Sequence, residues 1–154
     1  MSRTSRDAHS YAIIPLLRIL AESKEKDMPK QHLNPSGMST PTGYSHVVKA
    51  GDTIYIAGQV ARAPDGSLVG KDDPAAQAEQ IYKNIQNALG SVGASLQDLV
   101  KTTTYVVSPD CIDAVREARA KYLASDPPTS TLLIVSRLAT PELLLEIEAI
   151  AYVG

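Results

Sequence analysis

Residues 143–151 read Leu-Leu-Leu-Glu-Ile-Glu-Ala-Ile-Ala, a continuously apolar stretch with two carboxylates in its middle. A short apolar run of this kind is typical of a strand buried within a sheet. Because side chains alternate along a strand, Glu146 and Glu148 point to one face and the aliphatic residues beside them to the other. An ionised carboxylate is costly to bury unless it is hydrogen-bonded or paired. We therefore expect one face to line a core. On the other face, the glutamates either serve a site or are satisfied at a seam between subunits.

The segments upstream alternate between strand and helix patterns. Runs of β-branched and aromatic residues predict strands, and the apolar stripe after Asp73, with Pro74 in the first turn, predicts a helix that Gly93 ends. This order predicts one α+β domain in which two helices cover one face of a mixed six-stranded sheet. In chain order we expect strands at 44–49, 53–59 and 67–69, a helix from residue 73, a strand at 100–107, a helix at 111–124, and strands at 131–136 and 143–152.

No third long helix remains to cover the opposite face of this sheet. That face carries apolar residues such as Leu144 and Ile150 beside the glutamates. Self-association is the simplest cover, most naturally as a closed symmetric ring.

Residues 1–29 differ from the rest of the chain, which we assign to a single domain at 30–154. In the first part, Arg3 and Arg6 precede a short apolar stretch at 12–20, and a charged run follows at 22–27. The apolar stretch is too short to span a bilayer, and no convincing secretory cleavage site accompanies it. We expect an N-terminal extension that is either disordered or a short helix docking on the core or a partner.

Composition excludes several classes of function. The chain has 154 residues, 44% of them hydrophobic, which suffices for one domain with its own core. A net charge of −2 gives no general attraction for nucleic acid. A single cysteine, Cys111, cannot form an internal disulfide and indicates a reducing, cytoplasmic compartment; we expect it to pack rather than react. The three scattered histidines lack metal-ligand spacing, so no metal is expected.

Several short motifs recur in the order and spacing of one family. Together, from residue 43 to residue 153, they resemble the reactive intermediate deaminase family, also called the YjgF/YER057c/UK114 or L-PSP endoribonuclease family. The motifs are Gly43-Tyr44, Ile56-Ala57-Gly58-Gln59-Val60, the helical Gln77, Asn84-Ile85 and Ala88-Leu89, the strand at 100–106, Arg137-Leu138, and the segment at 146–151.

The resemblance implies a fold, an assembly and a reaction. The fold is chorismate-mutase-like, and the assembly is a homotrimer whose sheets form a central β-barrel with ligand pockets in the clefts between subunits. The best-known branch hydrolyses 2-imino acids or enamines to 2-keto acids and ammonia without a cofactor. By the same resemblance, Tyr44 matches a pocket tyrosine, Ala57, Gly58 and Gln59 match the strand end that lines the pocket, and Glu146 matches the glutamate that orients the attacking water.

One position departs from the family pattern. The arginine that holds the substrate carboxylate in the family falls on Ser130 here, and serine cannot supply a bidentate cationic fork. Losing such a contact costs about 2–5 kcal/mol, or about 30- to several-thousandfold in binding. Simple 2-imino acids should then be poor substrates, with Ser130 and Thr131 bonding an uncharged substrate, unless Arg116 or Arg119 of the second helix compensates. Solvated surface side chains are the more usual account of both arginines.

The sequence therefore predicts an enamine or imine deaminase-like hydrolase that acts on an unidentified small molecule, with Glu146 as its catalytic carboxyl group. Water addition to C=N requires a positioned water and a carboxyl group that exchanges protons. One alternative is a non-catalytic trimer that binds and senses a metabolite. Another is an endoribonuclease or translation inhibitor, which an acidic chain without a basic stripe does not favour. No cofactor, metal or membrane partner is expected.

Overall fold

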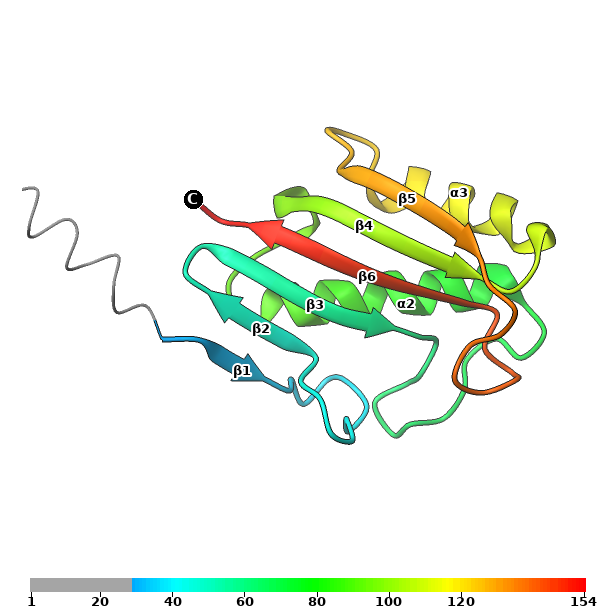
Figure 1. Ribbon diagram of the computed structural model, residues 1–154, viewed down its shortest axis with the longest axis horizontal. Coiled ribbons are helices and arrows are strands. Elements are labelled where there is room, and N and C mark those ends of the chain that lie inside the picture. Colours follow the sequence, from blue (N-terminus) through cyan, green and yellow to red (C-terminus); the bar gives the residue numbers. More distant parts are fainter. Residues whose placement is uncertain (1–28) are drawn as a thin grey trace, which may run out of the picture.

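The computed structural model describes residues 29–154 (Figure 1). The extension expected at 1–29 lies outside these residues, apart from its last position. Neither helix of the described part is long and apolar enough to cross a membrane. The elements are β1 (Gln31–Leu33), β2 (Val47–Ala50), β3 (Thr53–Gln59), α2 (Pro74–Gly90), the 3₁₀ turn η1 (Leu96–Asp98), β4 (Leu99–Val106), the 3₁₀ turn η2 (Pro109–Cys111), α3 (Ile112–Tyr122), β5 (Thr129–Ile134) and β6 (Leu145–Tyr152).

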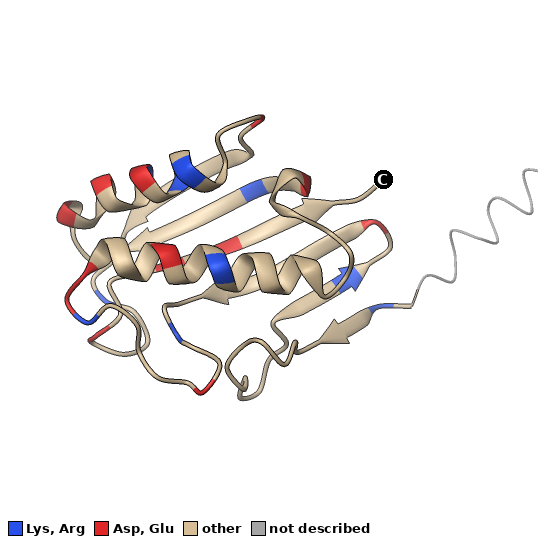
Figure 2. Cartoon of the chain, turned by 180° about the vertical axis from the view of Figure 1, so that it is seen from behind, with Lys and Arg blue, Asp and Glu red and all other residues tan. Residues whose placement is uncertain are grey.

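The strands form one sheet in the order β1-β2-β3-β6-β4-β5. All neighbours are antiparallel except β4 and β5, which run parallel. Both helices lie on the same face of the sheet, as Figures 1 and 2 show from its two sides. The prediction of an α+β domain with a mixed six-stranded sheet is confirmed. The central position of β6, between β3 and β4, explains why its sequence is largely apolar apart from the two glutamates.

Three local predictions need correction. Residues 67–69 form no strand, only an isolated bridge between Arg62 and Leu68. Asp65 closes the turn before them, because its Oδ1 accepts hydrogen bonds from the backbone N–H and the hydroxyl of Ser67 at 2.9 and 2.6 Å. These local bonds compete with the hydrogen bonds that would pair this segment with a neighbouring strand. The sixth strand is instead β1. Helix α2 ends at Gly90 rather than at Gly93, and the fifth strand begins at Thr129 rather than at Thr131.

The core lies between the sheet and the two helices. Asp73 caps α2, because its Oδ1 accepts hydrogen bonds from the N–H groups of Ala75 and Ala76 at 3.0 and 3.1 Å. Burying each large aliphatic side chain stabilises the fold by about 1.5–3 kcal/mol. The buried set includes Ile81, Ile85 and Leu89 of α2 and Leu145, Ile147, Ala149 and Ala151 of β6, each at most 3% exposed.

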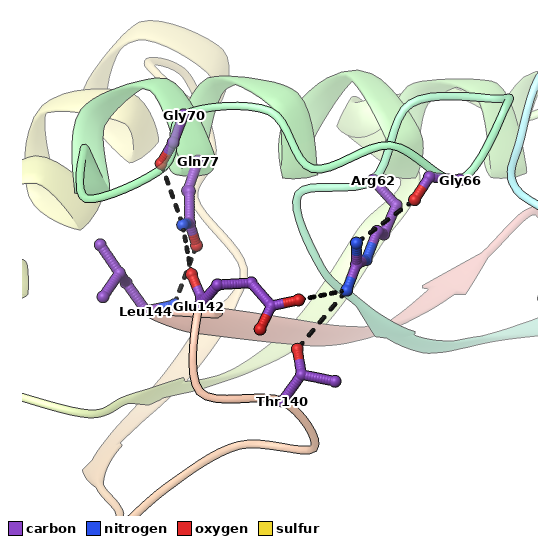
Figure 3. A network of polar contacts seen from close by, with 7 residues as sticks. All are labelled: Arg62, Gly66, Gly70, Gln77, Thr140, Glu142 and Leu144. Carbon is purple, nitrogen blue, oxygen red and sulfur yellow. Dashed lines mark hydrogen bonds and ion pairs between the residues drawn. The ribbon is translucent and has the colours of Figure 1, made fainter.

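A polar clamp fixes the loop that leads into β6 (Figure 3). Gln77 of α2 is fully buried, and its Nε2 donates to the carbonyl oxygens of Gly70 and Glu142 at 3.0 and 2.9 Å. Its Oε1 accepts from the N–H of Leu144 at 2.9 Å. Glu142 of the same loop also forms an ion pair with Arg62, which follows β3, and the two side chains are 2.9 Å apart. These bonds set the entry of β6 into the sheet, and therefore the position of its side chains.

Candidate functional site

The two glutamates of β6 lie on the face of the sheet that the helices leave uncovered. Burial alternates strictly along the strand, with Leu145, Ile147 and Ala149 buried and Glu146 half-buried. Glu148 is exposed. The predicted alternation is therefore confirmed, and Glu146 is the less solvated of the two carboxylates.

A bulge in β3 makes room for the Glu146 side chain. Ile56 faces Ala149, but Gln59 already faces Ile147, so two residues of β3, Ala57 and Gly58, oppose a single residue of β6. A Cβ at Gly58 would overlap Oε1 of Glu146 and lie 2.8 Å from its Cδ. Only glycine leaves space for this carboxylate against the backbone of the bulge.

A buried hydrogen-bond network supports this bulge and the tyrosine beside it. The amide Nε2 of Gln59 lies 3.3 Å from Nδ1 of His46 and donates to the carbonyl of Ala57 at 2.9 Å. His46 Nε2 lies 2.7 Å from the carbonyl of Ser39, which assigns the proton to Nε2. The Tyr44 ring packs edge-on against His46, with ring centroids 5.3 Å apart. Gln59 thus turns inward and supports the wall of the site rather than facing its opening.

The electrostatics favour a proton-exchanging role for Glu146. Burial raises the pKa of its carboxyl group, and the charge of Glu148 raises that pKa further. Burial and the charge of Glu146 raise the pKa of the Tyr44 phenol, so this tyrosine stays protonated near the carboxylate. Among residues 29–154, no group donates a hydrogen bond to the Glu146 carboxylate, and its Oε1 packs against the backbone at Gly58.

Two residues of β4, not predicted as site residues, complete the polar part of this face. Tyr105 lies opposite Glu146 and Thr103 opposite Glu148. The Tyr105 hydroxyl donates to Oε1 of Glu148 at 3.3 Å. Thr103, Lys101 and Glu148 border a hollow of about 300 Å³ that runs over β3, β6 and β4, whereas Tyr105 and Glu146 lie outside its lining. Alternation along the strand at 100–107 places Thr103 and Tyr105 on one face, but only knowledge of the strand order shows that this face is shared with the glutamates.

The structure does not bring Ser130 to Glu146 within one chain, and Thr131, which pairs with Thr103, shares the face of the glutamates but lies on the edge strand of the sheet. Ser130 and Thr131 both belong to this strand, β5, every residue of which is exposed. Ser130 pairs with Thr102, a buried residue of the helix-covered face. Glu146 lies on the opposite face and pairs with Tyr105, three residues further along β4. A pocket containing both would need a contribution from another molecule.

The two arginines of α3 lie in different settings. Arg116 is exposed and pairs with Asp113 at 3.3 Å. Arg119 is half-buried, and its Nη1 donates to Oγ of Ser130 at 3.4 Å. A guanidinium is therefore present at Ser130, although the residue itself carries no charge. Cys111 is buried in the core, and burial raises the pKa of its thiol, as suits a packing residue.

Comparison with known proteins places this architecture. The profile of the Endoribonuclease L-PSP family matches residues 36–153. A RutC family protein of Pyrococcus horikoshii is 37% identical over 109 residues, which cover 71% of this chain and 86% of that protein. Human 2-iminobutanoate/2-iminopropanoate deaminase is 31% identical over 111 residues, covering 72% of this chain and 80% of the human protein.

Solved structures show the same fold. RidA from an Antarctic Psychrobacter species superposes with a TM-score of 0.75 at 29% identity, covering 80% of this chain and 99% of that one. A Mycobacterium tuberculosis protein described as a member of the YjgF/YER057c/UK114 family superposes with a TM-score of 0.68 at 31% identity, covering 81% of this chain and 100% of that one. The chain belongs to the Endoribonuclease L-PSP family, also known as YjgF/YER057c/UK114.

Proposed function

We propose that this protein is a hydrolase that adds water to the C=N bond of a small imine and releases ammonia. The reaction converts R₂C=NH and H₂O into R₂C=O and NH₃, and an enamine enters it after tautomerising to the imine. The observation that carries the proposal is the Glu146 carboxylate, which is half-buried and has no hydrogen-bond partner among the described residues. It occupies the space left by the missing Cβ of Gly58, which we call the Gly58 notch. The name of the human relative, an imine deaminase, supports the same reaction class.

Each site residue then has a definite task. Glu146 accepts a hydrogen bond from the water and orients its oxygen toward the imine carbon. It takes the proton as the C–O bond forms and returns a proton to the departing amine. The raised pKa of this carboxyl group suits both steps, because a group that titrates closer to neutrality exchanges protons readily. Tyr44, half exposed beside it, closes the site over the substrate.

We further propose that the working form is a homotrimer with its sites in the clefts between subunits. The uncovered face and the free edge of the sheet support this. Leu132, Leu133 and Ile134 of β5 are 37, 42 and 54% exposed, an apolar edge that would pair or aggregate if left open. Light scattering of the purified protein tests the assembly, and a monomeric mass would refute it. We propose a cytoplasmic location on the same grounds as above, the single buried cysteine.

The catalytic proposal is tested with imines generated in situ from a panel of amino acids by an amino-acid oxidase. Semicarbazide traps the imine that remains, so a hydrolase lowers the yield of trapped product and accelerates release of ammonia. Wild-type protein should do so, and Glu146→Gln should not. Equal rates with both proteins would refute the assigned role of Glu146.

A binding module without turnover is the second candidate, and the replacement of the family arginine by Ser130 favours it. Thermal-shift screening separates the two, since a ligand that stabilises the protein but is never converted indicates sensing. Action on RNA has less support. In Figure 2 the basic and acidic positions are interspersed along both helices, with no basic stripe for a phosphate backbone.

A further inference from the structure

We propose that His46 is a positioning residue of this site, and that its imidazole holds the Gly58 notch and the Tyr44 ring in their working places only while it is neutral. Acid should therefore inactivate the protein at two groups, His46 and the Glu146 carboxyl group. The inference rests on the hydrolase proposed above and describes how pH controls it.

A directed chain of hydrogen bonds runs through the imidazole of His46, which is 3% exposed. It begins at the carbonyl oxygen of Ala57, which accepts from Nε2 of Gln59 at 2.9 Å. The same amide nitrogen lies 3.3 Å from Nδ1 of His46, and Nε2 of His46 donates to the carbonyl oxygen of Ser39 at 2.7 Å. Both ends of the chain are backbone carbonyls, which can only accept. The amide and Nε2 must therefore donate, and Nδ1 must accept.

A second proton on His46 finds no acceptor in this chain. It would set an N–H at Nδ1 against the N–H of Gln59, two donors 3.3 Å apart. Turning the Gln59 amide over does not help, because its oxygen would then face the carbonyl oxygen of Ala57 at 2.9 Å. A buried charge without a partner is costly, and no carboxylate among residues 29–154 forms an ion pair with His46. Protonation must therefore break the contact between His46 and Gln59.

The titratable groups around His46 do not compensate the added charge. The Tyr44 ring packs edge-on against the imidazole, and burial and the charge of Glu146 raise the pKa of its phenol, so this neighbour stays neutral. His32 of β1 is exposed and lies 3.4 Å from the hydroxyl of Ser45. The remaining contacts come from the β3 amide and the loop carbonyl described above, neither of which titrates.

Loss of the neutral imidazole reaches Glu146 by two routes. The amide that bridges to the imidazole also holds the carbonyl of Ala57, the first of the two bulged residues of β3. The second is Gly58, which leaves the space that the carboxylate occupies. By the other route, the imidazole supports the Tyr44 ring, with ring centroids 5.3 Å apart. Both the catalytic carboxylate and the tyrosine that closes the site therefore depend on one uncharged ring.

An NMR titration tests this coupling without reference to catalysis. It uses full-length Glu146→Gln protein, in which position 146 cannot titrate and disturb its neighbours. At pH 8, long-range ¹H–¹⁵N spectra should show the His46 proton on Nε2. As pH falls through the range of about 8 to 5 in which histidine ordinarily changes charge, the side-chain amide of Gln59 and the backbone amide of Gly58 should shift with the same midpoint as His46.

The conservative variant removes the proton and keeps the hydrogen bonds. The amide of His46→Gln can donate to Ser39 and accept from Gln59, so the acid shift at Gly58 should vanish. A proton on Nδ1 at pH 8, a His46 that stays neutral throughout, or a protonated His46 with unchanged Gln59 and Gly58 signals would overturn the proposal. The titration of Glu146→Gln decides between these outcomes even if His46→Gln does not fold.

The pH profile of imine hydrolysis gives an independent readout. Below both titrations, wild-type kcat/KM should fall by about a hundredfold per pH unit, because two protonations each inactivate the site. His46→Gln retains only the titration of Glu146, so its kcat/KM should fall by about tenfold per unit and match the wild type at pH 8 within about threefold. His32→Gln, the control at an exposed histidine, should keep the wild-type profile. Equal acid slopes in the wild type and His46→Gln would contradict the role of His46.

The failures of the two proposals are distinguishable. If Gly58 and Gln59 follow the protonation of His46 while no imine is ever hydrolysed, the positioning role stands and the hydrolase is refuted. If the wild type hydrolyses imines and Glu146→Gln does not, while the Gly58 signal ignores His46, the hydrolase stands and the positioning role is refuted.

Discussion

Gly58→Ala should separate catalysis from folding in this protein. The added Cβ would overlap Oε1 of Glu146 and lie 2.8 Å from its Cδ, well inside the 3.4 Å at which ordinary contacts begin. The obstructing group is the end of a flexible side chain, so the carboxylate can withdraw while the backbone of β3 stays in place. Gly58 does not need a positive φ, so alanine adopts its backbone conformation without strain.

The two expected effects differ in size. Replacing glycine by alanine at a compatible position changes the free energy of unfolding by less than about 1 kcal/mol, and often favourably. Displacing a catalytic group by about 1 Å costs about a hundredfold in rate. We therefore expect Gly58→Ala to unfold at the wild-type denaturant concentration and to hydrolyse imines about a hundredfold more slowly.

Gly90→Ala provides the matched control. This glycine ends α2, has no atom within 4 Å of an added Cβ and does not need a positive φ. The control should leave the rate unchanged and, if anything, stabilise the fold. The assay is the trapped-imine assay beside urea unfolding of all three proteins. Full activity in Gly58→Ala, or a Gly58→Ala structure in which Glu146 has not moved, would contradict the inference that the space at Gly58 holds Glu146 in its working position.

Two further predictions follow from the contacts around β6. Burial and the neighbouring charge of Glu148 raise the pKa of the Glu146 carboxyl group, so the folded state binds a proton at this group more tightly than the unfolded chain does. The free energy of unfolding therefore falls as pH rises from the ordinary carboxyl pKa through the raised one. Glu146→Gln should therefore raise Tm at pH 8 and change it much less at pH 4; a Tm gain confined to acid pH would contradict the sign. Gln77→Leu removes three buried hydrogen bonds and leaves their partners unsatisfied, so the free energy of unfolding in urea should fall by about 3 kcal/mol; a loss below about 1 kcal/mol would show that the loop repacks.

The sequence predicted the architecture correctly wherever the spacing of apolar residues alone distinguishes a strand from a helix. Alternation along 143–151 gave the correct faces to Glu146 and Glu148, and the helical stripe after Asp73 gave α2 its cap and core face. Those signals are local and strong. By contrast, β1 has only three residues, and its Gln-His-Leu sequence carries no strand pattern, so only its partner β2 makes it a strand.

The candidate site was predictable only in part, because it depends on contacts between distant segments. The bulge at Ala57 and Gly58 exists only in register with β6, which no local pattern reveals. Likewise, the parallel pairing of β5 with β4 turns Ser130 toward α3, away from the face of Glu146. The contact between Arg119 and Ser130 follows from that pairing, and no local sequence pattern at either residue predicts it.

The separation of Glu146 from Ser130 within one chain determines how the proposed assembly would have to work if both residues serve one site. Glu146 and Ser130 lie on opposite faces of the sheet, on the strands β6 and β5 that flank β4. Their partners on β4 are Tyr105 and Thr102, three residues apart, which is about 10 Å along the strand. A small imine cannot reach both within one chain. If Glu146 and Arg119 serve the same substrate, they must come from different subunits, and two inactive variants should then repair each other. If the protein forms the proposed trimer, assemblies made from equal amounts of Glu146→Gln and Arg119→Gln would regain both native groups in about one quarter of their clefts. About one quarter of wild-type hydrolysis of a 2-imino acid should then return on mixing after denaturation and refolding. Activity that stays at the level of the unmixed variants, although mass spectrometry shows mixed trimers, would mean that the two groups do not share a cleft.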